Sequence, residues 1–159
     1  MKNRSLKFYY SKFPVADIEK MIKTCPEINN FVFSYYSDEP ADYLQLIVYA
    51  QMGKDESKTQ YSSYTETLSP FRGQALEITG PVIISNNYIT IEAMNLLIGT
   101  AAEDSEKKPD YLVFTPGLDD TNHIFYSVTA FIKNDEGDKI TEGPGYIITN
   151  PSPPATMPV

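Results

Sequence analysis

Alternation of apolar and polar residues is the strongest pattern in this chain, and it predicts a protein built mostly of strands. Residues 43–52 and 123–133 each carry a regular apolar face opposite a more polar one, as expected of strands buried on one side. The apolar faces consist of Leu44, Leu46, Val48, Ala50 and Met52 in the first segment and of Ile124, Tyr126, Val128, Ala130 and Ile132 in the second. Shorter aromatic or β-branched runs predict further strands at 5–10, 31–36, 110–115, 138–141 and 146–149.

Two segments repeat their apolar residues at helical spacing instead. The first covers residues 15–25 and is ended by Pro26, and the second covers residues 90–102, where Thr90 is suited to cap the helix. Their apolar stripes are Val15, Ile18, Met21, Ile22 and Cys25, and Ile91, Met94, Leu97, Ile98 and Ala101.

Other stretches leave alternatives open. Residues 53–73 are polar and match either an edge strand or a loop, and residues 74–85 contain strand material interrupted by Gly80 and Pro81. Pro116 and Gly117 are predicted to end the strand that precedes them. The segment 134–137, Asn-Asp-Glu-Gly, predicts a hairpin turn.

These elements predict an α+β fold in which a mainly antiparallel, curved sheet packs against two helices. A β-sandwich is the alternative, because residues 126–141 have the pattern of two sandwich strands and a turn. The two helical segments argue against a sandwich. Residues 1–150 are predicted to form one domain, and residues 151–159, with four prolines and no charge, an extended tail.

The order strand, helix, strand, strand occurs twice, and the tripeptide Asp-Tyr-Leu occurs at both 42–44 and 110–112. This order resembles the paired βαβββ modules of the vicinal oxygen chelate superfamily, which includes glyoxalases and extradiol dioxygenases. The resemblance implies a pseudo-duplicated βαβββ arrangement. Members of that superfamily bind a divalent metal through His and Glu side chains, and the single histidine here, His123, is too few for that ligand set. The resemblance therefore implies a metal-free binding protein.

Composition excludes several classes of function. The chain has 159 residues and a formal net charge of −8, which argues against nucleic acid as a partner. It lacks an apolar run of the roughly 18 residues that a membrane span needs, and its first residues lack the apolar core of a signal peptide. We therefore expect a cytoplasmic protein without membrane contact. A single cysteine excludes a disulfide framework.

Motifs for catalysis and cofactor binding are missing, so neither a cofactor nor a metal is expected. The sequence has no Gly-rich phosphate loop and no nucleophile elbow. Cys25 and His123 are the residue types of a nucleophile and its base, but Cys25 lies on the apolar stripe of its helix and is predicted to be buried and structural. A calcium loop over residues 132–143 fails because Ile132 and Gly143 stand where acidic ligands are required. The acidic pairs at 103–104, 119–120 and 135–136 are interpreted as solvated loop residues.

Aromatic residues on the more polar strand faces are the best candidates for a binding site. The chain has twelve tyrosines, eight phenylalanines and no tryptophan. Tyr43 and Tyr49 lie on the more polar face of one long strand, and His123 and Phe125 on that of the other. Such a face suits a ligand cavity, a second packing layer or a partner surface, and coverage by the helices is the structural alternative.

The sequence thus predicts a non-catalytic binding or protein-interaction module. We expect its partner to be another protein or a second copy of the chain rather than a small molecule. The alternative is a metal-independent small-molecule-binding protein, or an enzyme with an unrecognised site.

Overall fold

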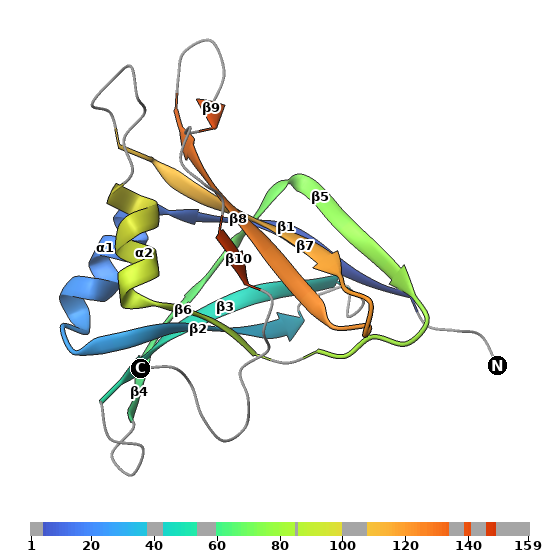
Figure 1. Ribbon diagram of the computed structural model, residues 1–159, viewed down its shortest axis with the longest axis horizontal. Coiled ribbons are helices and arrows are strands. Elements are labelled where there is room, and N and C mark those ends of the chain that lie inside the picture. The colour runs from blue at the N-terminus through green and yellow to red at the C-terminus, as the bar shows by residue number, and fades with distance from the viewer. Residues whose placement is uncertain are drawn as a thin grey trace.

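A computed structural model describes residues 5–37, 43–53, 60–84, 86–99, 108–133, 139–140 and 146–148. These residues form ten strands and two helices (Figure 1). The strands are β1 (Ser5–Pro14), β2 (Ile28–Ser37), β3 (Tyr43–Met52), β4 (Gln60–Thr67), β5 (Ser69–Thr79), β6 (Asn87–Thr90), β7 (Tyr111–Leu118), β8 (Ile124–Ile132), β9 (Lys139–Ile140) and β10 (Tyr146–Ile148). The helices are α1 (Val15–Thr24) and α2 (Ile91–Gly99).

All ten strands belong to one curled sheet, so the fold is a sheet-dominated α+β fold. Its main path runs β10-β8-β7-β1-β3-β2-β6, while β4 pairs with β3, β5 with β1 and β9 with β8. Among the described strands only β1 and β3 pair in parallel. The β-sandwich alternative is wrong, because a sandwich needs two sheets.

Both helices cover the inner face of the curled sheet, and their buried residues belong to one core cluster (Figure 1). α1 begins directly after Pro14, whose fixed φ suits the start of a helix, and it buries Val15, Ile18 and Met21. α2 begins after Thr90, whose side-chain oxygen accepts a hydrogen bond from the Ala93 amide at 3.2 Å. The predicted cap at Thr90 is therefore confirmed.

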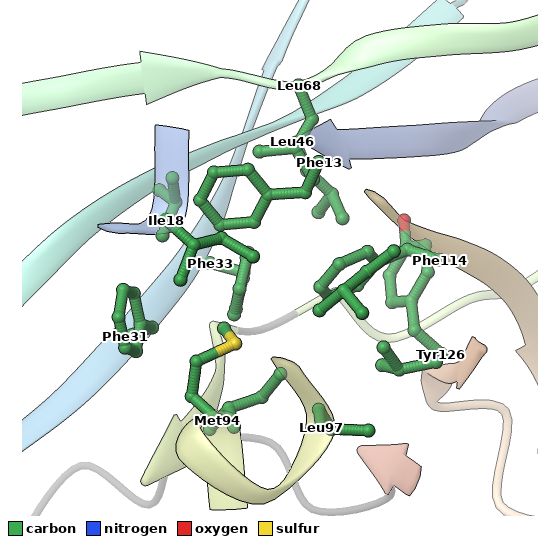
Figure 2. Close-up of a cluster of buried hydrophobic side chains, with 14 of the residues drawn as sticks. Phe13, Ile18, Phe31, Phe33, Leu46, Leu68, Met94, Leu97, Phe114 and Tyr126 are labelled. Carbon is green, nitrogen blue, oxygen red and sulfur yellow. The ribbon is translucent and has the colours of Figure 1, made fainter. Parts of the chain in front are cut away.

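Aromatic rings fill the space between the helices and the sheet (Figure 2). The rings of Phe33 and Phe114, both fully buried, have centroids 4.9 Å apart. Phe13 lies edge-on to Phe33 at 6.3 Å, and Met94 of α2 is buried in the same cluster. These contacts connect β1, β2, β7 and α2 in one core.

Strand β1 contains a bulge at Tyr9 and Tyr10 that exchanges its two faces. Phe8 is buried before the bulge, whereas Ser11 and Phe13 are buried after it. An extra residue in a strand shifts the alternation of side chains by one position, which explains the change from even to odd numbers.

Strand β5 crosses β1 at this bulge. At Lys7, β1 lies between β3 and β5, whereas at Ser11 it lies between β7 and β5. Since β3 and β7 are on opposite sides of β1, β5 changes sides within residues 71–74, and Figure 1 shows its sharp bend there. Positive φ at Arg72 (55°) and Gly73 (67°) turns the chain, and glycine adopts such a φ without strain.

The order β–α–β–β occurs twice, as the sequence predicted, and the two halves pair reciprocally. Pro14, which ends the first strand of the first half, pairs with Tyr111 in the second half. Thr90, which ends the first strand of the second half, pairs with Asn30 in the first half. Each half thus places its first strand beside the strand that follows the helix of the other half.

The structure corrects several boundaries predicted from the sequence. Residues 60–67, left open between strand and loop, form β4. The prediction that Pro116 and Gly117 end a strand is wrong, because both lie inside β7, opposite Tyr126 and Phe125. β1 pairs with β7 only over residues 111–114, so Pro116 has a paired strand on one side only, where a missing amide is tolerated.

The hairpin turn at 134–137, the end of the predicted helix beyond Gly99 and the proline-rich tail at 151–159 lie outside the described residues. The short strands predicted at 138–141 and 146–149 are present over their described residues as β9 and β10. Both pair with β8.

Replacing Phe114 with alanine is expected to lower the free energy of unfolding by about 3–5 kcal/mol, because it opens a cavity in the aromatic core. The matched change Phe125→Ala removes the same ring from the outer face of the neighbouring strand, where Phe125 is only partly buried. Urea denaturation of both variants tests this difference. Equal losses would contradict a core confined to the inner face.

Candidate functional site

The four residues selected from the sequence lie on the outer face of the sheet, opposite the helices. Tyr43 and Tyr49 alternate with inward residues of β3, Phe125 does so in β8, and His123 directly precedes β8. In the sheet order, β7 and β1 lie between β8 and β3. The structure therefore brings these residues onto one face but in two separate places.

Tyr43 is held by contacts with β1. Its ring stacks on Tyr9 with centroids 4.9 Å apart, and the Lys7 ammonium lies 4.7 Å from the Tyr43 centroid. Beside it, the Tyr36 hydroxyl donates a hydrogen bond to the Gln45 side chain. Stacking and cation–π attraction fix this ring without any further molecule.

Tyr49 lies where the outer face is itself packed. It is opposite Val32 of β2 and Thr65 of β4, and its hydroxyl accepts a hydrogen bond from Asn86 Nδ2 at 3.3 Å. Val32 is only 1% exposed although it belongs to the outer face. This part of the face is a second packing layer rather than an open surface.

A third group of aromatic residues is covered by the crossing segment of β5. Phe71 packs on Tyr111 and Phe131 with centroid distances of 6.1 and 5.9 Å, and these two rings stack on each other at 5.3 Å. The Lys12 ammonium lies 4.3 Å from the Tyr111 centroid. The sequence-based alternative was coverage of such faces by the helices, whereas here a strand segment covers them.

The end of the β7–β8 hairpin differs from these three places because it exposes apolar side chains. Ile83, Ile84 and Leu118 are 47%, 39% and 40% exposed. The Ile83 backbone pairs with the start of β8, since its amide donates to the Asn122 carbonyl and its carbonyl accepts from the Ile124 amide.

Leu118 is opposite Ile124 and therefore belongs to the inner side of the sheet, whereas Phe125, and Ile83 through its bridge to His123, belong to the outer side. We call Ile83, Ile84, Leu118 and Phe125, which come from both sides of the sheet at this end, the hairpin patch.

Asp119 organises the turn beside the hairpin patch. One of its carboxylate oxygens accepts hydrogen bonds from the Thr121 amide, the Thr121 hydroxyl and the His123 amide, all at 2.8–2.9 Å. These bonds, led by the one from the His123 backbone, lower the pKa of the Asp119 carboxyl. The Thr121 hydroxyl also lies 2.8 Å from His123 Nδ1, so the turn fixes the imidazole ring.

Gly117 provides the floor under Phe125. A Cβ added at residue 117 would lie 2.5 Å from Cζ of the Phe125 ring, far inside van der Waals contact. The ring therefore lies directly over the glycine backbone, and only glycine leaves room for it. This contact explains why a strand interior contains a glycine.

The described residues offer little support for catalysis or metal binding. Cys25 is buried, as predicted from its helical stripe, and is 5% exposed. Among the described residues no three His, Cys, Asp or Glu side chains come close enough to hold a metal ion. The acidic pairs at 103–104 and 135–136 lie outside the described residues. None of the helices in the described part is long and apolar enough to cross a membrane.

A cavity of about 400 Å³ lies at the end of α1, away from the hairpin patch in sequence and in the sheet. It is lined by Pro26, Glu27, Ile28, Asn29 and Gly53. The Asn29 side-chain nitrogen donates to the Gly53 carbonyl and so already has an acceptor. Glu27 is the ionisable residue in the lining of this cavity.

A polar cluster lies inside the core, where sequence patterns predicted only apolar contacts. Asn87 Nδ2 donates to the hydroxyl of Tyr35 in β2 at 3.3 Å, and the ring of Tyr35 lies beside that of Tyr126 in β8 with centroids 6.4 Å apart. Burial raises the pKa of Tyr35 to about 12 and that of Tyr126 well above its ordinary value.

Comparisons with protein-family models, with curated proteins and with solved structures found no match. They give no support to the resemblance to the vicinal oxygen chelate modules, so function has to be argued from this chain alone.

Sequence reasoning missed the hairpin patch apart from Phe125. The signal was present, because Val82, Ile83 and Ile84 form an apolar run after Gly80-Pro81. The run was interpreted as strand material, which predicts burial. Among the described residues its backbone is joined to the sheet by the isolated bridge between Ile83 and His123, and Val82 packs against the core.

Gly117→Ala is expected to destabilise the protein by about 1–3 kcal/mol, because the added methyl group pushes the Phe125 ring off its floor. Gly99→Ala is the control, since nothing lies within 4 Å of a Cβ at that position. It is expected to change the unfolding free energy by less than about 1 kcal/mol. Thermal and urea denaturation measure both, and equal effects would contradict the Phe125–Gly117 contact.

The protein is expected to lose stability as the pH rises from 10 to 12. Tyrosine in the unfolded chain ionises near pH 10.0, whereas the pKa of Tyr35 in the folded protein is about 12. The folded state thus retains a proton that the unfolded state has lost, so stability is complete below pH 10 and decreases above it.

Tyrosinate absorbance during an alkaline titration tests this expectation. The folded protein should show late-ionising tyrosines, and Tyr35→Phe should remove one of them while Tyr126 remains. Ionisation of all tyrosines in one step while the protein remains folded would contradict it.

Proposed function

We propose that this chain is a non-catalytic protein-interaction module whose contact surface is the hairpin patch. The observation that carries the proposal is the exposure of Ile83, Ile84 and Leu118 at one end of the sheet, beside the turn that joins β7 to β8. Exposed apolar side chains are costly to leave in water, at about 25 cal/mol per Å² of apolar area. A partner that covers them gains this free energy.

The form of the patch favours a protein over a small molecule. Its side chains project from the end of the sheet, and the cavity at the end of α1 lies elsewhere. Asp119 and Asp120 stand at its rim, so a partner with basic residues around an apolar centre has the matching chemistry.

The turn residues support a binding role rather than a catalytic one. Asp119 uses one carboxylate oxygen for three internal hydrogen bonds, and Thr121 bonds both Asp119 and His123. Cys25, the only thiol in the chain, is buried. These groups stabilise the hairpin that presents the patch.

We also infer that the fold is a pseudo-duplication of a βαβββ unit. The reciprocal pairing of β1 with β7 and of β6 with β2 supports it. So does the equivalent placement of Phe33 opposite Val48 and of Phe114 opposite Val128. If the two halves are equivalent, β8 of the second half corresponds to β3 of the first half. The hairpin patch then lies at the start of β8.

Photo-crosslinking tests the proposed contact. A photoreactive residue at position 118 should yield a discrete adduct in cells of the source organism, whereas the same residue at position 96, where the leucine is 74% exposed on α2, should not. An adduct of twice the chain mass identifies a second copy, and any other mass a different protein. Equal labelling from both positions, or none from 118, would refute the patch as the contact surface.

Replacing Ile83 and Leu118 with serine should weaken the association about 10- to 100-fold, because two apolar contacts are lost. The fold should remain intact, since both side chains are exposed in the free protein. Titration of the purified partner, or sedimentation over a concentration series for self-association, measures the change. Leu96→Ser is the matched control and should bind as the unaltered protein does.

A further inference from the structure

The loop between β7 and β8 has a backbone that its own hydrogen bonds define. The Asp119 amide donates to the His123 carbonyl at 3.0 Å, and the Asn122 amide donates to the Asp119 carbonyl at 3.1 Å. Asn122 has a positive φ of 64°, which asparagine adopts more readily than most residues. A turn followed by a residue of positive φ is a common form of three-residue hairpin loop. The backbone therefore fixes where the side chains of Asp119, Thr121 and His123 begin.

These three side chains form a chain of hydrogen bonds that has one consistent direction. Thr121 Oγ1 lies 2.8 Å from Asp119 Oδ1 and 2.8 Å from His123 Nδ1. An ionised carboxylate has no proton and a hydroxyl has one, so the proton between the two oxygens comes from Thr121. Thr121 Oγ1 has no second proton to give to His123 and accepts one instead. The protonated ring nitrogen of the neutral imidazole is therefore Nδ1.

The other ring nitrogen of His123, Nε2, is then a hydrogen-bond acceptor. A neutral imidazole that carries its proton on Nδ1 has an unshared electron pair on Nε2. Among the residues that the structure describes, none is hydrogen bonded to Nε2, and the side chain is 29% exposed. The parallel bridge between Ile83 and His123 places both side chains on the outer side of the sheet. The acceptor thus lies beside the hairpin patch, within reach of a molecule bound there.

We propose that His123 Nε2 is the fixed acceptor by which the hairpin patch selects a basic protein partner, through a lysine or arginine N–H donor. This inference rests on the proposed function, because it names the partner chemistry of the same surface. The charged residues of the loop are Asp119 and Asp120, and segment 80–84, which pairs with His123, has none. A positively charged donor therefore meets an acceptor and negative charge at the same place.

The same geometry makes the contact sensitive to pH. Protonation of the ring keeps the bond from Nδ1 to Thr121 but turns Nε2 from an acceptor into a positively charged donor. Such a ring repels a lysine or arginine side chain. Binding should therefore weaken over the pH range in which His123 titrates, although Asp119 and Asp120 keep their charge there.

Long-range proton–nitrogen NMR of the imidazole tests the tautomer without any partner. His123 is the single histidine of the chain, so its two ring nitrogens need no assignment among several residues. At a pH where the ring is neutral, Nδ1 should carry the proton. Thr121→Val removes the acceptor of that proton, so the proton should shift towards Nε2, which free histidine prefers. Thr121→Ser keeps the hydroxyl and should retain the proton on Nδ1. A proton on Nε2 in the unaltered protein, or an unchanged tautomer in Thr121→Val, would overturn the proposal.

A synthetic peptide of alternating leucine and lysine is the probe for binding. It should shift the Nε2 signal of the unaltered protein and of Thr121→Ser, and bind Thr121→Val about 10-fold more weakly, because one charge-assisted hydrogen bond is lost. The two variants have the same net charge, so non-specific attraction cancels between them. Binding to the unaltered protein should also weaken as its ring signals titrate, and a peptide with glutamate in place of lysine should not bind.

The outcomes separate this contact from the proposed function. Binding that needs Ile83 and Leu118 but leaves the Nε2 signal unmoved, or that is equal in Thr121→Val and Thr121→Ser, refutes the His123 contact alone. Binding that does not change when Ile83 and Leu118 are replaced with serine refutes the patch as the contact surface, and the contact with it.

Discussion

Strand β1 must pair with three other strands within ten residues, and the rest of the sheet depends on how it does so. The bulge at Tyr9 and Tyr10 makes this possible, because it turns Phe8 and Phe13 to the same inner side despite their odd spacing. The Ser11 hydroxyl, buried beside the bulge, donates to the Tyr9 carbonyl at 3.3 Å and so has a partner inside the sheet. The same irregularity gives β5 a place to cross.

The core follows from the reciprocal pairing of the two halves. Phe33 and Phe114 meet at 4.9 Å where the halves join, and the two helices contribute apolar residues at matching positions. These are Ile18 and Met21 from α1 and Met94 and Leu97 from α2. Because both helices are used on the inner face, the outer face has to be covered by strand side chains and by Phe71 of the crossing segment.

Local sequence patterns predicted the features that depend on neighbouring residues: one strand, one helix stripe and one helix cap. The alternation in residues 43–52 matches β3, the stripe of α1 places Cys25 in the core, and Thr90 caps α2. Contacts between distant residues were beyond such reasoning. Gly117 was interpreted as a turn residue because its reason for being glycine, the Phe125 ring of the next strand, appears only once the register is known. The crossing of β5 and the polar contacts of Tyr35 likewise depend on pairings that no single segment specifies.

The candidate site illustrates the same limit and sharpens its interpretation. Aromatic content alone gave Tyr43, Tyr49, His123 and Phe125 equal standing, but their surroundings separate them. Tyr43 has Tyr9 and Lys7, and Tyr49 has the Asn86 side chain, so these rings are already satisfied within the chain. At the start of β8 the turn fixes His123, while the apolar side chains beside it remain 39–47% exposed. A surface whose polar side chains are held by hydrogen bonds and whose apolar side chains are exposed is suited to binding another protein. Binding then costs little conformational entropy, because the turn is already ordered.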